Sequence, residues 1–293
     1  MSTFTLQKEI SMKAFLGMGL LGSNFAKAMR KRGDEVQVWN RTASKASELE
    51  KFGAKAFSNV ADAVKGADTI HLTLKDDASV DEVLQEASAS LTPGAVIIDH
   101  TTTSKEGAIR RTKQWKEKGF FYQHAPVFMG PVNALESTGF MLVSGDEELI
   151  RKIEPELSKM TGKLLKFGPQ PGKAAAMKLA GNAFLVCFTA GIRDTLCLAK
   201  ALDISVAELF MLFDSWNPAA MLPGRLKRMT SGDYSDPSWM LNMARKDTGL
   251  FIETAQQSKI DLAIIPSIAK LMDEFIEKGF GEQDWTVIAK DCN

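Results

Sequence analysis

Short apolar runs alternate with amphipathic stretches over the first half of the chain. The runs that predict strands cover residues 14–16, 36–39, 69–74, 96–99, 122–125 and 140–144, with an edge strand over 164–167. Helical spacing lies between them, over 22–32, 44–52, 59–65, 80–87, 105–118 and 147–159. Strands that alternate with helices indicate a mostly parallel sheet covered on both faces, joined by right-handed crossovers. We therefore predict a doubly wound α/β domain.

The pattern changes after a cluster of turn residues, Gly168-Pro169-Gln170-Pro171-Gly172. A long helix is predicted over 173–202, and most later residues follow a helical pattern. We place an α/β domain at 12–170 and an all-α domain, opened by the long helix, at 171–293. That helix is interrupted by Asn182, Arg193, Asp194 and Lys200, so we interpret it as the central helix of a folded protein, not a membrane span.

Composition limits the classes of partner. The 293 residues are 45% hydrophobic and 25% charged with a formal net charge of zero, so no basic field favours nucleic acid or a membrane surface. The basic stretch 110–118 is interpreted as a solvated helix face. Residues 1–12 lack the long apolar core of a secretory leader. Cys187 and Cys197 are interpreted as buried thiols, and we expect a cytoplasmic protein. The cysteines and histidines have no metal-ligand spacing, so no metal is expected.

A glycine-rich turn follows the first predicted strand, and it carries the residues Gly17, Met18, Gly19, Leu20, Leu21 and Gly22. Gly17 permits a tight turn, Gly19 lets backbone approach a pyrophosphate, and Gly22 allows the helix to pack closely on the sheet. The helix then offers free N–H groups to the phosphates. With a strand before it and a helix after it, the turn predicts a Rossmann-type dinucleotide site. The same sheet edge carries Leu74, Lys75, Thr101 and Thr102, which we expect beside the cofactor.

The residues after the second strand favour one cofactor. NAD enzymes usually place a carboxylate there for the ribose 2′-hydroxyl, whereas this chain has Asn40, Arg41 and Thr42. A guanidinium and a hydroxyl suit a 2′-phosphate, so NADP(H) is favoured over NAD(H).

Lys178 and Asn182 lie at positions i and i+4 of the long helix and share one face, with small residues nearby. A partly desolvated ammonium beside an amide suits acid–base work on a carbonyl or hydroxyl group. Spacing alone also fits one more solvated helical lysine.

These motifs together resemble the β-hydroxyacid dehydrogenase family, which includes 3-hydroxyisobutyrate dehydrogenase and the glyoxylate/succinic semialdehyde reductases, with 6-phosphogluconate dehydrogenase and the imine reductases as more distant relatives. The resemblance spans residues 13 to about 288. It includes the glycine turn, the segment 39–42, the segment 99–104, the loop that begins at Ala125, the pair Lys178 and Asn182, and the pair Lys246-Asp247.

The resemblance implies an NADP(H)-dependent oxidoreductase that acts on a small hydroxyacid or semialdehyde-type carbonyl. It implies that Lys178 is the general acid/base, that Asn182 binds the substrate oxygen, and that Lys246 reaches cofactor or substrate. Thr102 and the loop residues Val127, Phe128, Met129 and Gly130 would contact substrate. Similar proteins form dimers or tetramers, so we expect a homodimer or homotetramer.

The loop departs from the family pattern. After Ala125-Pro126-Val127 the family usually has Ser-Gly-Gly, which holds a substrate carboxylate, whereas this chain has Phe128-Met129-Gly130. A phenylalanine side chain cannot donate a hydrogen bond, so a more apolar pocket is one interpretation and ordinary loop packing is the other. Two further hypotheses remain open: C=N reduction, as in the imine reductases, and a catalytically silent dinucleotide-binding scaffold.

Overall fold

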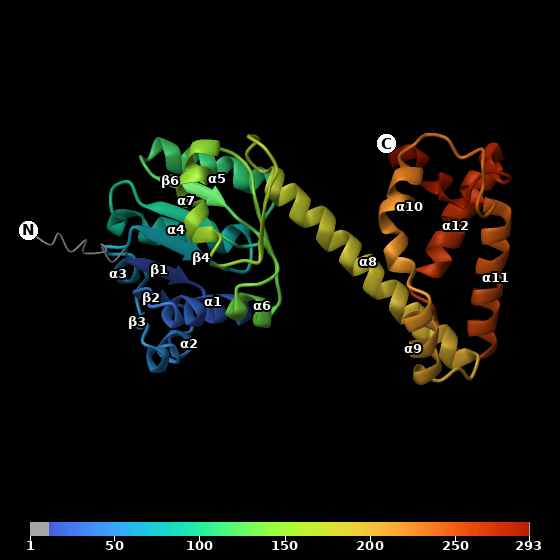
Figure 1. Ribbon diagram of the computed structural model, residues 1–293, viewed down its shortest axis with the longest axis horizontal. Helices are drawn as coiled ribbons and strands as arrows, with labels where there is room; N and C mark the ends of the chain where they lie inside the picture. Colours follow the sequence, from blue (N-terminus) through green and yellow to red (C-terminus); the bar gives the residue numbers. More distant parts are fainter. Residues whose placement is uncertain (1–11, 293) are drawn as a thin grey trace, which may run out of the picture. The chain divides into compact units, whose positions relative to one another are not determined.

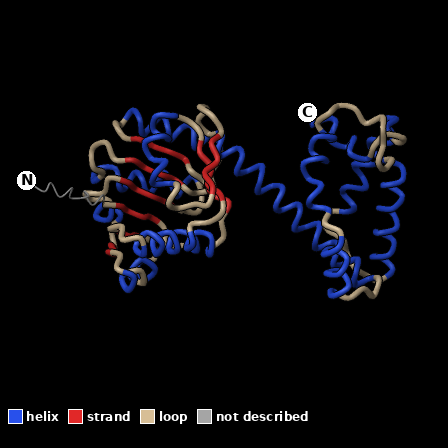
Figure 2. Tube along the Cα trace, in the orientation of Figure 1, coloured by secondary structure: helices blue, strands red, loops and turns tan. Residues whose placement is uncertain are grey.

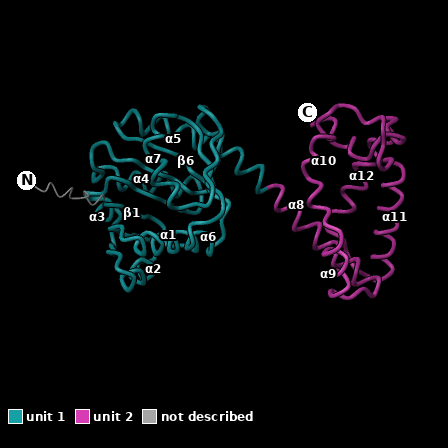
Figure 3. Tube along the Cα trace, viewed as in Figure 1, with its two compact units in different colours: residues 1–182 teal, residues 183–293 magenta. Residues whose placement is uncertain are grey.

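The computed structural model describes residues 12–292 and divides the chain into two compact units, 1–182 and 183–293, with the division inside one long helix (Figure 3). The segment 1–11, where we expect no secretory leader, lies outside the described residues.

The first unit is built on a six-stranded parallel sheet, seen as the near-parallel strands of Figure 2. The strands follow the order β3-β2-β1-β4-β5-β6. Their bounds are β1 (Lys13–Leu16), β2 (Val36–Trp39), β3 (Lys55–Phe57), β4 (Thr69–Leu72), β5 (Val96–Asp99) and β6 (Phe121–His124). The strand order reverses between β1 and β4, and ligands of such sheets bind where the carboxyl ends diverge at this point.

Helices cover both faces of this sheet (Figure 1). They are α1 (Leu20–Lys31), α2 (Ala43–Ser47), η1 (Glu50–Phe52), α3 (Val60–Ala63), α4 (Asp77–Ala87), η2 (Ser88–Ser90), α5 (Lys105–Glu117) and α7 (Glu147–Leu157). One face buries Phe15 and Ile98 against α1 and α7, and the other buries Leu16 and Ile70 against α3 and α4. Two-sided burial explains why most residues of these strands are apolar. The predicted fold class is confirmed.

A second, three-stranded sheet completes the first unit. It consists of β7 (Val127–Phe128), β8 (Phe140–Val143) and β9 (Lys163–Lys166), with α6 (Pro131–Glu136) between β7 and β8. β7 pairs antiparallel to β8, and β8 pairs parallel to β9. We expected the last two strands to extend one mostly parallel sheet, and that expectation is wrong. β7 and α6 are too short to show a period in the sequence.

The second unit is helical. After α8 (Lys173–Ala201) come α9 (Val206–Ser215), η3 (Pro218–Met221), α10 (Leu222–Met229), α11 (Leu241–Gln257), α12 (Ile265–Phe275), η4 (Ile276–Phe280) and η5 (Trp285–Cys292). Its core gathers Leu241, Met272, Phe275 and Val287. The Asp194 carboxylate of α8 accepts the amide N–H groups of Ala263, Ile264 and Ile265, and so fixes the start of α12.

Helix α8 alone among the described helices has the length and mean hydropathy, 1.5, of a membrane span, and only 11% of that window is buried. Cys187 is exposed and Cys197 is half-buried, so the interpretation of both as buried thiols is wrong. Arg193, whose role the sequence left open, donates to Asp194 at 2.9 Å.

Candidate active site

In the glycine turn between β1 and α1, an added Cβ would clash with backbone at two glycines and would meet nothing at the third. Gly17 has a φ of +99°, and a Cβ placed there would lie 2.2 Å from the Thr73 carbonyl oxygen. A Cβ on Gly22 would lie 1.9 Å from the Gly17 carbonyl oxygen. A Cβ on Gly19 would meet nothing within 4 Å. Gly17 and Gly22 therefore shape the turn, and Gly19 leaves its outer side open to a ligand.

Helix α1 begins at this turn with its amino end free of side-chain caps. Gly19 is the N-cap residue and supplies no side-chain hydrogen bond, and Leu20 is 77% exposed. Met18 is buried and Leu21 packs against the core. These two residues, which we predicted to contact the cofactor, could therefore contact a ligand only through their backbone groups. An uncapped helix start presents N–H donors and a positive dipole end, which suits a pyrophosphate.

Asn40, at the end of β2, supports the turn. Its Oδ1 accepts the Met18 amide N–H at 2.9 Å, and its Nδ2 donates to the Thr42 carbonyl oxygen at 3.0 Å. Arg41 is exposed, and within residues 12–292 no hydrogen bond or ion pair holds its guanidinium. The Arg41 guanidinium is therefore available to an external anion, whereas the Asn40 side chain is already hydrogen-bonded within the protein.

The loops after β4 and β5 form the other side of this edge. The Leu74 amide donates to Thr101 Oγ1 at 2.9 Å, and the Thr101 amide donates to Asp99 Oδ1 at 2.9 Å. Lys75 and Thr102 are exposed. Thr101 thus joins the two loops, and Thr102 faces outward.

A buried polar network lies beneath these loops. Arg111 is fully buried and donates to Asp77 Oδ1 at 2.6 Å and to the Tyr122 hydroxyl at 2.9 Å. Tyr122 donates in turn to Asp99 Oδ2 at 2.6 Å, and the other Asp77 oxygen accepts the Ser104 amide at 2.8 Å. Burial raises the pKa of Tyr122, so its hydroxyl keeps its proton. The network fixes the starts of α4 and α5, which follow the loops that contain Leu74 and Thr101.

Sequence reasoning missed this network. It assigned Arg111 to a solvated basic face, and that assignment is wrong because Arg111 lies beneath the edge while Arg110 stays at the surface. The position of Arg111, four residues after a buried Gly107 on the same helix face, was the available signal.

The three histidines are buried, and their rings form hydrogen bonds inside the first unit. His71 Nδ1 lies 3.1 Å from His100 Nε2, and His100 Nδ1 lies 2.8 Å from the Ala125 carbonyl oxygen. His124 Nε2 lies 2.9 Å from the Thr101 carbonyl oxygen. Burial lowers the pKa of all three, that of His100 to about 4, so the rings are neutral at pH 7. Within residues 12–292 no cluster of potential ligands has metal-binding geometry.

The start of α8 is fixed at the same edge. The Ala174 amide donates to Ser144 Oγ at 2.9 Å, and a Cβ on Gly172 would lie 2.9 Å from the carbonyl oxygen of Lys105, the first residue of α5. α5 directly follows the loop that contains Thr101 and Thr102. In Figure 1 the strand arrows point toward the side where α8 begins.

Lys178 lies about one turn into α8 and is only 9% exposed. Its ammonium donates to Asn182 Oδ1 at 3.0 Å and lies 4.3 Å from the centroid of the Phe128 ring. No carboxylate of the described residues forms an ion pair with it. Desolvation by burial lowers its pKa below the ordinary 10.5. Lys178 is thus a desolvated ammonium held by an amide and an aromatic ring.

The predicted substrate loop packs against Lys178. Val127 is buried, and Phe128, Met129 and Gly130 are half-buried. The Gly130 amide donates to Asn133 Oδ1 at 2.8 Å at the start of α6. The structure therefore brings Phe128, Lys178 and Asn182 together in the first unit. Lys246 belongs to the second unit, where it pairs with Asp247 at 2.8 Å, and its contact with cofactor or substrate stays a prediction.

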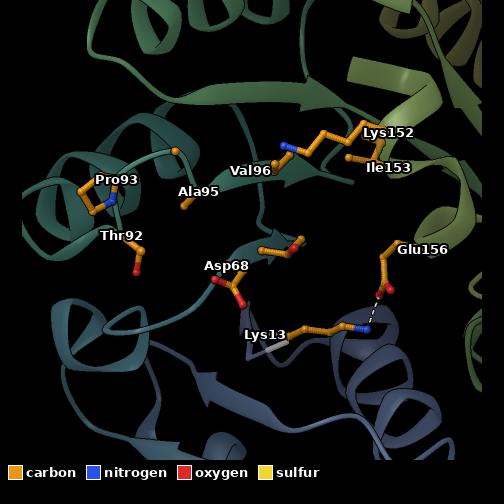
Figure 4. A pocket seen from close by; sticks show the side chains of 11 residues that line it. Lys13, Asp68, Thr92, Pro93, Ala95, Val96, Lys152, Ile153 and Glu156 are labelled. Atoms are coloured by element: carbon orange, nitrogen blue, oxygen red, sulfur yellow. Dashed lines mark hydrogen bonds and ion pairs between the residues drawn. The ribbon is translucent and has the colours of Figure 1, made fainter. Parts of the chain in front are cut away.

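A cavity of about 350 Å³ lies at the opposite, amino-terminal edge of the sheet (Figure 4). Lys13 at the start of β1 forms an ion pair there with Glu156 at 2.6 Å. Lys13 is also 3.1 Å from Asp34, so its charge is balanced by carboxylates. This edge contains neither the glycine turn nor Lys178, so we place no catalytic chemistry in it.

Two family models cover nearly the whole chain. Residues 13–168 match the model described as the NAD binding domain of 6-phosphogluconate dehydrogenase. Residues 172–291 match the model described as the NAD-binding domain of NADP-dependent 3-hydroxyisobutyrate dehydrogenase.

Individual proteins are similar over the same length. The chain is 26% identical to 3-sulfolactaldehyde reductase of Escherichia coli over 280 residues, 94% of this chain and 93% of that protein. It is 25% identical to an NADPH-dependent reductive aminase of Aspergillus oryzae, with 93% and 94% covered. Its structure is similar to that of an imine reductase from Myxococcus stipitatus in complex with NADP⁺, with a TM-score of 0.89 at 21% identity over 96% of this chain and 100% of that one.

Proposed function

Because this chain belongs to the β-hydroxyacid dehydrogenase family and is an NAD(P)-dependent oxidoreductase, we propose that it reduces a small carbonyl compound with NADPH and Lys178 as the general acid. The reverse reaction oxidises the corresponding hydroxy compound, with Lys178 as the base. The observation that carries the proposal is the desolvated Lys178 ammonium, which donates to Asn182 and forms no ion pair with a carboxylate of residues 12–292.

The residues of the first unit fit the cofactor. The space outside Gly19 and the uncapped start of α1 suit a pyrophosphate, and the free guanidinium of Arg41 suits a 2′-phosphate. Lys75, Thr101 and Thr102 would border the bound cofactor on the other side of the strand reversal. When bound, this cofactor supplies or accepts a hydride at the reacting carbon.

Lys178 and Asn182 would act on the substrate oxygen. During reduction the C=O π bond breaks, the carbon gains the hydride, and the Lys178 ammonium gives its proton to the oxygen. Asn182 accepts from Lys178 through Oδ1, which leaves its Nδ2–H groups to donate to the developing alkoxide. Burial helps this transfer because the lowered pKa of Lys178 makes its ammonium a stronger acid.

Reduction of a C=N bond is the second candidate, favoured by the similarity to a reductive aminase and by the apolar Phe128 beside the lysine. The same Lys178 would then face a nitrogen. A dinucleotide-binding scaffold without catalytic activity is the weaker hypothesis, because it does not require the Lys178–Asn182 pair.

We further propose a cytoplasmic homodimer or homotetramer, with no nucleic-acid or membrane partner. Apolar side chains on α8 and α9 are largely exposed in one copy, among them Val186 at 68%, Phe210 at 66% and Met211 at 70%. A second copy of the chain would cover this face, and Cys187 with it. Sedimentation velocity that shows only monomer at micromolar concentration would contradict this expectation.

Arg41→Ala tests the cofactor preference. We expect the variant to lose about ten- to hundredfold in NADPH affinity, because a charge-assisted pair to the 2′-phosphate is lost, while its NADH affinity is unchanged. Titration of cofactor fluorescence measures both, and Lys45→Ala, on the following helix, is the matched control. An equal loss for NADH and NADPH would contradict the assignment.

A further inference from the structure

Phe128 and α8 fit each other closely. The tip of the Phe128 ring lies against Gly181, where an added Cβ would come within 2.3 Å of the ring Cζ. The ring face lies 4.3 Å from the Lys178 ammonium, within the range of a cation–π interaction. Phe128 therefore occupies a place that exists because residue 181 is a glycine, and its ring forms one wall around the lysine.

This arrangement uses two of the three directions in which the ammonium can donate. One N–H group donates to Asn182 Oδ1 at 3.0 Å, and the Phe128 ring covers another side. The remaining side is available to the substrate oxygen that receives the proton. A substrate carboxylate has no second free direction on Lys178, so it would compete with the reacting carbonyl for the same side.

The loop after β7 offers few donors to a carboxylate. Phe128 has no side-chain donor, and Pro131 has no backbone N–H. The Gly130 amide already donates to Asn133 Oδ1 at 2.8 Å, and the Asn133 Nδ2 donates to Thr138 Oγ1 at 3.0 Å. A carboxylate here would meet no side-chain hydroxyl of residue 128, and reaching the Gly130 amide or the Asn133 Nδ2 would require breaking these hydrogen bonds.

We propose that Phe128 determines substrate specificity and that the site takes carbonyl compounds whose group beside this ring is uncharged. The inference rests on the proposed reductase function and names its substrate class. The ring takes part in two ways: it holds the Lys178 ammonium without a counter-ion, and it excludes an anion from the space that it fills.

The test compares two aldehydes, 4-oxobutanoate and its methyl ester, with NADPH as the reductant; the ester has one more methyl group and carries no charge. We expect kcat/KM of the wild-type protein to favour the ester by tenfold or more. Phe128→Ser restores a hydroxyl donor and opens the space, so it shifts the ratio toward the acid by about ten- to hundredfold. Phe128→Leu is the matched control, because it stays apolar and keeps the preference for the ester.

Binding provides a readout that does not depend on turnover. Calorimetry of the NADP⁺-bound protein with butanamide and with butanoate should show tighter binding of the amide. A wild-type preference for either anion, or the same ratio in Phe128→Ser as in wild type, would overturn the inference. Turnover that survives in Lys178→Ala would instead refute the proposed general acid, while the ratios for Phe128 would still decide the specificity.

Discussion

Replacing Gly19 and Gly22 by alanine separates the binding role of the glycine turn from its structural role. Gly19 has a φ of −78°, which alanine adopts without strain, and its Cβ would point into open space. As an N-cap substitution, Gly19→Ala should lower the free energy of unfolding by less than about 1 kcal/mol. At Gly22 the Cβ would lie 1.9 Å from the Gly17 carbonyl oxygen and 2.4 Å from Thr73 Oγ1. Because α1 must move away, we expect a loss of about 3 kcal/mol.

Gly19→Ala should weaken NADPH binding although it changes the stability of the protein little. The methyl group of Gly19→Ala would occupy the open space through which we propose that the phosphates approach the backbone. Losing one amide hydrogen bond to a phosphate costs about 1.5–3 kcal/mol, which raises the Kd for NADPH about ten- to hundredfold. The stability of the protein without cofactor stays near the wild-type value.

Fluorescence titration with NADPH and urea unfolding followed by circular dichroism measure the two effects. Gly224→Ala is the matched control, because its Cβ also meets nothing within 4 Å but it lies in α10 of the other unit. A wild-type Kd for Gly19→Ala would refute the assignment of this turn to the pyrophosphate. Stability of Gly22→Ala equal to wild type would refute the packing argument.

Three further predictions concern pH and the buried network. In the reduction direction kcat/KM should fall as pH rises through the pKa of Lys178, at a pH below the 10.5 of a free lysine; a profile that stays flat to pH 10.5 would contradict the general-acid role. Because the pKa values of His71 and His100 are lowered in the folded state, only the unfolded state binds protons at these histidines just below pH 6.5. The free energy of unfolding should therefore fall between pH 7 and pH 5, by up to about 1.4 kcal/mol per pH unit for each of the two histidines. Equal urea unfolding at the two pH values would exclude buried neutral rings. Tyr122→Phe leaves the buried Asp99 Oδ2 without its 2.6 Å donor and should cost about 1–3 kcal/mol, measured by urea unfolding; an unchanged midpoint would show that the hydroxyl is dispensable.

Features set by local backbone chemistry could be predicted from the sequence. Gly17 has the positive φ of a tight turn, and Gly22 has the close approach between helix and turn that the sequence predicted. Five of the six parallel strands, β1, β2, β4, β5 and β6, and the long helix α8 were also predicted within a few residues, since their apolar runs are bounded by turn residues. The strand β3 was not predicted, because it is short and not buried. The fold class follows from these elements, and the family was inferred from the resemblance of the sequence motifs.

Features set by contacts between distant residues could not be predicted. The packing of Phe128 on Gly181 and Lys178 joins positions some fifty residues apart, and neither local pattern contains it. Arg111 was interpreted as solvated because its neighbours are basic, although its partners Asp77 and Tyr122 bury it. The exposure of Cys187 was missed because an apolar helix pattern predicts burial, whereas this side chain is exposed.

The central claim is tested most directly by NADPH oxidation at 340 nm with wild-type protein and Lys178→Ala, over semialdehydes, 2-oxo acids, neutral aldehydes and cyclic imines. We predict that the wild type reduces at least one carbonyl compound and that the variant loses about 10²- to 10⁴-fold in kcat, with an unchanged Kd for NADPH. Reduction of an imine that survives in Lys178→Ala would favour the second candidate. Absence of turnover across all four classes, with NADPH still bound, would contradict the account.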